Sequence, residues 1–357
     1  MNAVDLFAGA GGASRGLHDA GYEVVGYDHW PPAVECHNAN GLPAHLHDLS
    51  DPAQDHLIPY APLWWASPPC QPFSAAGAGD GEFDGRDGFP WLLRLVTLRL
   101  PDVLIVENVK GLTFRKHSAY LCGILEALRA LGYHVEWKVL LAADFGVPQT
   151  RERCIIVARR DGGRITWPAP THCETGGMFT ARWVSMADAL GWDAGLPIMA
   201  RHQRGAGMID RHGERPDRPI TEPAMTIRQG GGGDPGGFVL VGNNSIAGGP
   251  LAERRLDEPA MTLGVRGDLW KWCDHRPATS INGDHRVSAP GRHDPTISGS
   301  QQADAIRLTT HELATLQGFP ANWTWTGTKT QQARMIGNAV PPRLAEVVAT
   351  NNRPATP

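Results

Sequence analysis

The feature that most limits how this chain can fold is the alternation of short apolar strands with helical stretches through its first 160 residues. This pattern is typical of a parallel sheet, because the crossover between two parallel strands needs a connection about as long as a helix. The strands are expected at Ala3–Phe7, Tyr22–Tyr27, Ala44–His47, Leu63–Ala66, Asp102–Glu107, His134–Leu141 and Cys154–Ala158. The sequence therefore predicts an α/β fold with a doubly wound, Rossmann-like, seven-stranded sheet.

Helices are expected between these strands and again near the C-terminus. The Ser118–Leu131 stretch is amphipathic, because its leucines recur at helical spacing along one stripe. The other expected helices are Ala13–Ala20, a helix following Pro31 and Pro32, Trp91–Leu100, Thr309–Leu316, Gln331–Ile336 and Pro342–Ala349.

A second domain is indicated by a change of composition after Pro170. The residues that follow are rich in Gly, Pro, Arg, His and Asp, and they lack long helical periodicity. Three short repeats place Pro223, Pro259 and Pro295 at equal 36-residue intervals, which we interpret as recurring strand starts. We expect residues 171–320 to form a smaller, irregular, β-rich domain, and residues 1–170 plus 321–357 to form the first domain.

Charge is divided unevenly between the two parts of the chain. Residues 1–150 hold 9 Lys and Arg against 17 Asp and Glu, whereas the remainder holds 24 against 20. Only five of the 33 basic residues are lysine. Arginine is suited to paired hydrogen bonds with phosphates and guanine edges, so the distribution suggests an anionic partner for the second part.

Several classes of protein are disfavoured by what the sequence lacks. It has no run of about 18 apolar residues that would span a membrane, and Asp5 lies where a signal peptide would be apolar. The six cysteines have no paired spacing, so a reduced, cytoplasmic protein is expected. The repeated Asp-His-Arg at 274–276 and 284–286 lacks further ligands at usable spacing, so no metal site is expected.

The first strand leads into a glycine-rich turn and a helix, Asp5-Leu6-Phe7-Ala8-Gly9-Ala10-Gly11-Gly12. Glycines there let a ligand approach the backbone, and an acidic residue ending the second strand, Asp28, can bind ribose hydroxyls. A nicotinamide dinucleotide would use the same parts, and a tight turn without any ligand is a further interpretation. Asp48, after the third strand, is either an adenine contact or an ordinary helix N-cap.

Cys70 follows the fourth strand, within Ser67-Pro68-Pro69-Cys70-Gln71-Pro72-Phe73-Ser74. Ligands of such folds bind at the carboxyl ends of the strands, where a thiol of lowered pKa can act as a nucleophile. The Gly- and Asp-rich stretch Ala75–Gly88 resembles a lid. The other five cysteines are interpreted as inert packing residues.

Two further groups of polar residues come at strand ends. Glu107 closes the fifth strand within Glu107-Asn108-Val109, so its side chain is expected in the same crevice as Cys70. Arg151 and Arg153, within Gln149-Thr150-Arg151-Glu152-Arg153, are two residues apart and share one face of an extended segment. Both can therefore address one anionic or carbonyl partner.

Six motifs now stand in order: Asp5–Gly12, Pro69-Cys70-Gln71, Glu107-Asn108-Val109, Gln149–Arg153, Arg307-Leu308-Thr309 through Leu316-Gln317-Gly318-Phe319-Pro320, and Gly337-Asn338-Ala339-Val340-Pro341-Pro342. Together they resemble the DNA (cytosine-5)-methyltransferase family of bacterial or phage type. The resemblance covers residues 1–170 and 305–350.

The resemblance implies an enzyme that transfers a methyl group from S-adenosylmethionine to C5 of a flipped-out cytosine in a specific double-stranded DNA sequence. It implies that Cys70 bonds to C6, that Glu107 binds N3 and the amino group, and that Arg153, supported by Arg151, reaches O2. The implied cofactor contacts are Phe7, Ala8, Gly9, Gly11, Gly12, Asp28, His29, Asp48, Leu49, Pro69, Asn338 and Val340. The implied DNA contacts are Gln71, Ser74, Asn108, Gln149, Arg228 and Arg266.

The same resemblance implies a monomer that serves restriction-modification or phage and host DNA protection, beside an endonuclease acting separately. Three alternatives remain open. Some relatives methylate transfer RNA, although that branch has a compact middle region. A nicotinamide oxidoreductase would leave Cys70, Glu107 and Arg153 unexplained, and a non-catalytic DNA-binding relative would not need every catalytic position filled.

Overall fold

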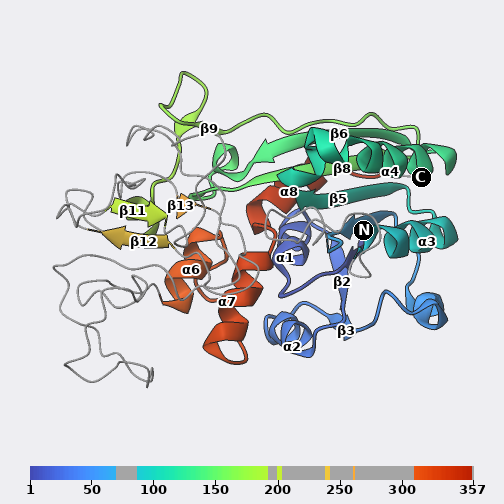
Figure 1. The fold of residues 1–357 in the computed structure, drawn as a ribbon, viewed down its shortest axis with the longest axis horizontal. Helices are drawn as coiled ribbons and strands as arrows, with labels where there is room; N and C mark the ends of the chain where they lie inside the picture. The colour runs from blue at the N-terminus through green and yellow to red at the C-terminus, as the bar shows by residue number, and fades with distance from the viewer. Residues whose placement is uncertain (70–86, 192–198, 203–237, 242–259, 262–308, 356–357) are drawn as a thin grey trace.

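A computed structural model gives the fold shown in Figure 1, in which a twisted sheet carries helices on both faces. The structure describes residues 1–69, 87–191, 199–202, 238–241, 260–261 and 309–355. Of the three short segments between 199 and 261, only the backbone is described.

The seven-stranded sheet has the order β3-β2-β1-β4-β5-β8-β6. All neighbouring strands are parallel except β8, which pairs antiparallel with both β5 and β6. The strands are β1 (Asn2–Leu6), β2 (Glu23–Asp28), β3 (Ala44–Leu46), β4 (Leu63–Ala66), β5 (Val103–Val109), β6 (His134–Leu141) and β8 (Glu152–Arg159). The predicted doubly wound α/β sheet is confirmed, with strand ends shifted by up to two residues.

The α-helices of the first 160 residues are those that the sequence predicts. They are α1 (Gly12–Asp19), α2 (Pro31–Ala39), α3 (Phe89–Arg99) and α4 (Ser118–Ala130). Short 3-10 helices that the sequence did not predict also occur, among them η1 (Pro52–Leu57), which begins where the Asp51 carboxylate accepts a hydrogen bond from the Ala53 amide.

Two apolar layers enclose the sheet. On one face, α3 and α4 cover side chains such as Leu104 and Ile156, and on the other, α1 and the last helix cover Ile105 and Ile155. Successive residues of a strand point to opposite faces, so β4, β5 and β8 are apolar on both sides. These central strands therefore read as continuous apolar runs in the sequence.

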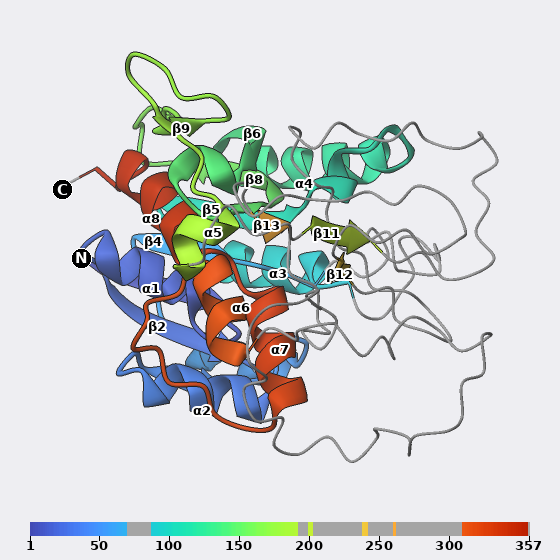
Figure 2. The same ribbon diagram turned by 90° about the vertical axis from the view of Figure 1, so that its left-hand side faces the viewer.

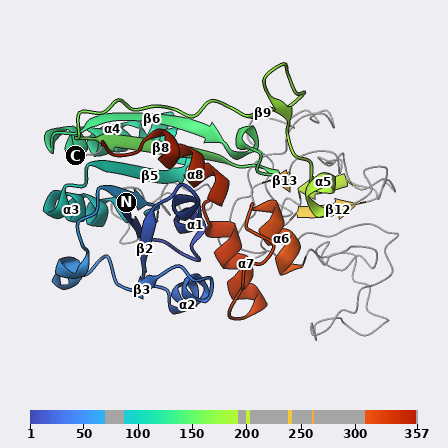
Figure 3. The ribbon, with the colours of Figure 1, turned by 180° about the vertical axis from the view of Figure 1, so that it is seen from behind.

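The C-terminal segment returns to the side of α1 and the sheet, as Figures 2 and 3 show. Its helices are α6 (Thr310–Leu316), α7 (Lys329–Asn338) and α8 (Pro342–Asn351). The last of these packs against α1 so closely that a Cβ on Gly16 would overlap the Pro342 carbonyl oxygen. The extreme end is held by Asp161, whose carboxylate accepts hydrogen bonds from Arg159 and from the Ala355 amide.

Between residues 171 and 308, the described parts of the chain form only short elements. β9 (His172–Cys173) pairs with β10 (Ala181–Arg182), and α5 (Met186–Leu190) follows. Short pairings also join β11 (Met199–His202) to β12 (Phe238–Val241), and β13 (Ala260–Met261) to β7 (Gln149–Thr150). The prolines of the 36-residue repeats lie outside the described residues.

Within the described residues, we find no helix with the length and apolar character that a membrane span requires.

Gly16→Ala should destabilise the fold, because the new methyl group meets the backbone of α8, which cannot rotate away. We expect a loss of roughly 1–3 kcal/mol in the free energy of unfolding, measured by urea denaturation. Gly123→Ala is the matched control, because Gly123 lies in α4 with open space around its α-carbon. The control should be neutral or stabilising by up to about 1 kcal/mol. Equal losses in the two variants would contradict the packing described for α1.

Candidate active site

An ion pair between Glu107 and Arg153 lies at the edge of the sheet where β5 ends. Arg153 Nε is 2.7 Å from Glu107 Oε1, and both side chains are about nine-tenths buried. The two residues share one face, because Glu107 is opposite Ile155 in the antiparallel ladder and Arg153 is two residues from Ile155. The family resemblance implied that these two residues contact the same base, and the structure brings their side chains into contact.

Arg151, the second predicted arginine, is buried more deeply. Its Nη1 donates a hydrogen bond of 3.1 Å to the carbonyl of Gly337 in α7. Burial, with the neighbouring Arg153 adding to it, lowers the pKa of Arg151 well below its ordinary value, and Glu107 opposes the shift. Through this hydrogen bond, Arg151 connects α7 to the residue just before β8.

Gln149 and Gln317 form a buried polar pair that the motifs alone did not reveal. Gln149 Nε2 donates to Gln317 Oε1 at 2.9 Å, and Gln317 Nε2 donates to the Ala339 carbonyl. The pair connects the segment before β8 to α6 and to the residue after α7. Each glutamine stands within one of the sequence motifs, but the sequence did not indicate that the two side chains would be in contact.

Cys70 and residues 71–86 lie outside the described residues, but both ends of this segment are placed. The Gly88 amide donates to the Pro69 carbonyl at 3.1 Å, so the chain leaves and re-enters the fold at one point. Asn108 Nδ2 donates to the Pro68 carbonyl at 3.2 Å. The residue next to Glu107 therefore holds the backbone two positions before Cys70.

The remaining described cysteines differ in their surroundings. Cys36 and Cys154 are fully buried, and burial, with Glu107 adding to it, raises the pKa of Cys154 to about 12. Both therefore agree with the predicted packing role. Cys122 is exposed on α4, so that prediction is wrong there, because its position falls outside the apolar stripe of the helix.

The glycine turn after β1 is shaped by three left-handed residues and one carboxylate. Phe7 (φ 58°) ends the strand one residue earlier than predicted, and Gly9 (φ 54°) and Gly11 (φ 90°) follow. Asp28 at the end of β2 accepts a 2.8 Å hydrogen bond from the Gly9 amide and another from the Trp30 amide. No atom of the described residues lies within 4 Å of the place that a Cβ of Gly9 would take. This α-carbon is therefore open to a ligand.

The next two glycines face protein instead. A Cβ on Gly11 would lie 3.0 Å from the His37 ring, and one on Gly12 would overlap the Val340 carbonyl oxygen. The Val340 side chain is itself buried in the layer under α1. Burial lowers the pKa of His37 to about 4, so the ring that supports the turn is neutral at physiological pH.

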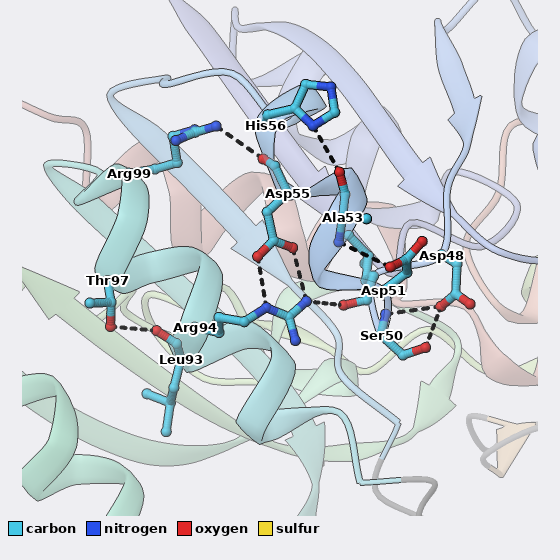
Figure 4. A network of polar contacts seen from close by, with 11 residues as sticks. Asp48, Ser50, Asp51, Ala53, Asp55, His56, Leu93, Arg94, Thr97 and Arg99 are labelled. Carbon is cyan, nitrogen blue, oxygen red and sulfur yellow. Dashed lines mark hydrogen bonds and ion pairs between the residues drawn. The ribbon is translucent and has the colours of Figure 1, made fainter.

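Asp48 lies at the start of a polar network shown in Figure 4. Its carboxylate accepts hydrogen bonds from the amide and hydroxyl of Ser50, which lower its pKa. The N-cap of η1 is Asp51, so the alternative interpretation of Asp48 as a helix cap is wrong. Arg94 of α3 binds both Asp55 oxygens and the Leu49 carbonyl, which fixes this loop beside the sheet.

Asp5 and Ser14 form a buried pair under the turn. Asp5 has no exposed surface, and its Oδ2 accepts a 2.7 Å hydrogen bond from Ser14 Oγ. Burial raises the pKa of Asp5 to about 7, the Ser14 bond opposes the shift, and the charges of Asp28 and Glu107 add to it. We predicted no structural role for Asp5 from the sequence, although an acidic residue inside an apolar strand was a visible signal.

Other predicted site residues lie at the rim or beyond the described part. His29 and Asn338 are exposed beside Asp28 and at the end of α7, respectively. Gln71, Ser74, Arg228 and Arg266 lie outside the described residues, as do both Asp-His-Arg repeats. Among the side chains that the structure describes, no group of three or more His, Cys, Asp or Glu could hold a metal ion.

A mostly parallel seven-stranded sheet with one antiparallel strand next to its edge is the fold of S-adenosylmethionine-dependent methyltransferases. Two solved structures share it across nearly their whole length. Schizosaccharomyces pombe Dnmt2 methyltransferase aligns with a TM-score of 0.57 at 17% identity, covering 98% of each chain. The Entamoeba histolytica methyltransferase EhMeth aligns with a TM-score of 0.58 at 15% identity, covering 98% and 97%.

The family follows from the sequence comparisons. Residues 1–176 and 266–352 match the model of the C-5 cytosine-specific DNA methylases, and the chain belongs to this family. It is 30% identical to the Type II methyltransferase M1.HphI of Haemophilus parahaemolyticus, over 97% of this chain and 85% of that protein. It is 29% identical to M.NaeI of Lentzea aerocolonigenes, over 99% and 75%.

The raised pKa of Asp5 predicts a pH-dependent stability. Between pH 3.8, the ordinary value, and about 7, the folded chain holds a proton that the unfolded chain has lost. The folded state therefore loses stability as the pH rises through this window, by up to about 4 kcal/mol. Asp5→Asn should remove that part of the pH dependence, measured as free energies of unfolding at pH 5 and pH 8.

Asp19→Asn, which breaks an exposed ion pair with Arg15 on α1, is the control and should follow the wild type. If Asp5→Asn and the wild type lose equal stability between the two pH values, Asp5 is not the titrating group.

Proposed function

We propose that this protein transfers a methyl group from S-adenosylmethionine to C5 of a cytosine flipped out of double-stranded DNA. The observation that carries the proposal is the buried Glu107–Arg153 pair at the carboxyl edge of the sheet, beside the anchored start of the segment that bears Cys70. A carboxyl and a guanidinium there can address opposite edges of one pyrimidine. Family membership supports the same chemistry.

The turn after β1 fits the cofactor. The open α-carbon of Gly9 leaves room for a ligand against the backbone, and Asp28 offers carboxylate oxygens to ribose hydroxyls beside it. Phe7, Ala8, His29, Asp48, Leu49, Pro69 and Asn338 complete the proposed contacts. Gly11, Gly12 and Val340 already have protein partners, so we assign them to shaping the turn. The bound cofactor supplies an electrophilic methyl group.

Cys70 is the proposed nucleophile. Its thiolate forms a bond to C6 of the cytosine, which makes C5 electron-rich enough to take the methyl group. A base then removes the C5 proton, and the electrons of that bond expel the Cys70 sulfur from C6. Pro68 and Pro69 restrict the backbone that leads to this residue, and Asn108 holds the Pro68 carbonyl.

Glu107 and Arg153 stabilise the base while the sulfur adds. We assign Glu107 to N3 and the amino group, where negative charge develops, and Arg153 to the O2 carbonyl. Their mutual ion pair holds both side chains in place before the base arrives. Arg151 binds the Gly337 carbonyl, and we propose that this bond fixes the backbone two residues before Arg153.

We further propose the division of labour between domains. Residues 1–170 plus 321–357 bind the cofactor and the target base, and residues 171–320 read the DNA sequence, with Arg228 and Arg266 as base or phosphate contacts. Gln71 and Ser74 are the proposed DNA contacts within residues 1–170. Asn108 and Gln149, which we expected beside them, are buried and bonded within the protein, so we assign them to positioning the segment before Cys70 and the start of β8. The Type II relatives favour a restriction-modification role as a monomer beside a separate endonuclease.

Methyl transfer should be measured with tritiated S-adenosylmethionine on PCR-amplified bacterial genomic DNA and, in parallel, on transfer RNA. We expect label in the DNA, and bisulfite sequencing should place it at cytosines in one sequence context. Label in transfer RNA alone would reverse the choice of substrate. Tight NADH binding without S-adenosylmethionine binding would replace the proposal with an oxidoreductase.

Cys70→Ser should abolish methyl transfer while the dissociation constant for S-adenosylmethionine stays within about twofold, because the cofactor turn is untouched. DNA amplified with 5-fluorodeoxycytidine triphosphate should trap the wild type on denaturing gels, since fluorine cannot leave C5 as a proton does. Cys154→Ser is the matched control and should still be trapped. Substantial methylation by Cys70→Ser would remove this residue from the mechanism.

A further inference from the structure

The connection between β5 and α4 presents an uncompensated pair of cations. It consists of two 3-10 turns, η4 (Lys110–Thr113) and η5 (Arg115–His117). No acidic residue occurs between Lys110 and His117. This segment, which we name the β5–α4 turn, belongs to the half of the chain in which acidic residues outnumber basic ones by 17 to 9.

Lys110 is already paired within this turn, and the next two cations are not. Lys110 Nζ lies 2.7 Å from Glu152 Oε1. Arg115 and Lys116 are exposed, and neither has an ion pair with another side chain in the part of the chain that the structure describes. Arg115 and Lys116 therefore expose two adjacent positive charges to solvent.

The β5–α4 turn lies at the same edge of the sheet as the candidate active site. Glu152, the partner of Lys110, stands between Arg151 and Arg153 in the sequence and begins β8. The turn itself starts directly after Val109, two residues beyond Glu107. The cations therefore stand beside the place where a target base must enter.

The same turn adjoins the end of the segment that bears Cys70. Tyr120, in the first turn of α4, donates a hydrogen bond to the Asp87 carboxylate and packs edge-on against Phe89. Asp87 is the first described residue after that segment. The start of α4, which directly follows the β5–α4 turn, therefore contacts the end of the segment that bears the proposed nucleophile.

We propose that Arg115 and Lys116 bind backbone phosphates of the DNA strand that carries the target cytosine. This inference rests on the proposed function and names a contact surface for it. A nucleotide that rotates out of the stack needs its flanking phosphates held, and two exposed cations beside the base pocket supply that restraint. The contact is independent of sequence, because phosphates carry none of the base information.

The chain offers a matched control at the opposite edge of the sheet. Arg129 is exposed in the last turn of α4, and Arg160 is exposed just after β8, where its amide donates to the Asp102 carbonyl before β5 begins. Replacing these two arginines changes the net charge as much as replacing Arg115 and Lys116 does. It leaves the active-site edge unchanged.

The test compares Arg115→Gln/Lys116→Gln with Arg129→Gln/Arg160→Gln in the full chain. Initial rates of methyl transfer to PCR-amplified bacterial genomic DNA are measured over a range of NaCl concentrations. The first variant should raise the KM for DNA about tenfold at 0.1 M salt, and it should flatten the plot of log(kcat/KM) against log[NaCl] by about 1.8, because each lost phosphate contact removes about 0.9. Its kcat at saturating DNA and its dissociation constant for S-adenosylmethionine should match the wild type.

The control variant should keep the wild-type slope, and so should Arg115→Lys/Lys116→Arg, because a phosphate accepts either cation. An unchanged slope in the first variant, an equal loss in the control, or a loss of cofactor affinity would each overturn the inference. A wild type that methylates no DNA contradicts the proposed function instead, so the two failures are distinguishable.

Discussion

The antiparallel pairing of β8 with β5 is the constraint on which the candidate site depends. In a fully parallel sheet, the residues before β8 would lie at the far edge, away from the end of β5. Because β8 runs the other way, its first residues meet the last residues of β5, and Arg153 reaches Glu107 across one strand spacing. The reversed strand thus converts two sequence motifs, more than forty residues apart, into one charged pair.

The segment that leads into β8, just before Arg153, is held by the C-terminal helices. Arg151 binds the Gly337 carbonyl, and Gln317 binds the carbonyl of Ala339 and the amide of Gln149. A few residues further on, the Val340 carbonyl lies against Gly12 and the Pro342 carbonyl against Gly16. One short stretch therefore contacts both the segment before Arg153 and the glycine turn, so the positions of the two candidate sites are coupled through it.

Much of this could be predicted from the sequence, since strand periodicity indicated the sheet and the ordered motifs indicated a family in which Glu107 and Arg153 would contact one base. What escaped prediction depends on contacts between distant segments. The roles of Gly11 and Gly12 could not be inferred, because His37 and Val340 reach them only after folding. Phe7 belongs to the turn because its backbone adopts a left-handed conformation that residue type alone does not indicate. The N-cap of η1 is Asp51 and not Asp48, because local backbone geometry decides where the helix begins.

The return of the last helix to α1 also bears on the order of events during synthesis. Residues 1–160 leave the ribosome long before α8, yet the layer beneath α1 is unfinished until Leu344 and Val348 arrive. A nascent chain that stops in the middle region would expose the apolar face of α1 to solvent. The turn after β1 and the helix that follows it are thus completed only after α8 has been synthesised.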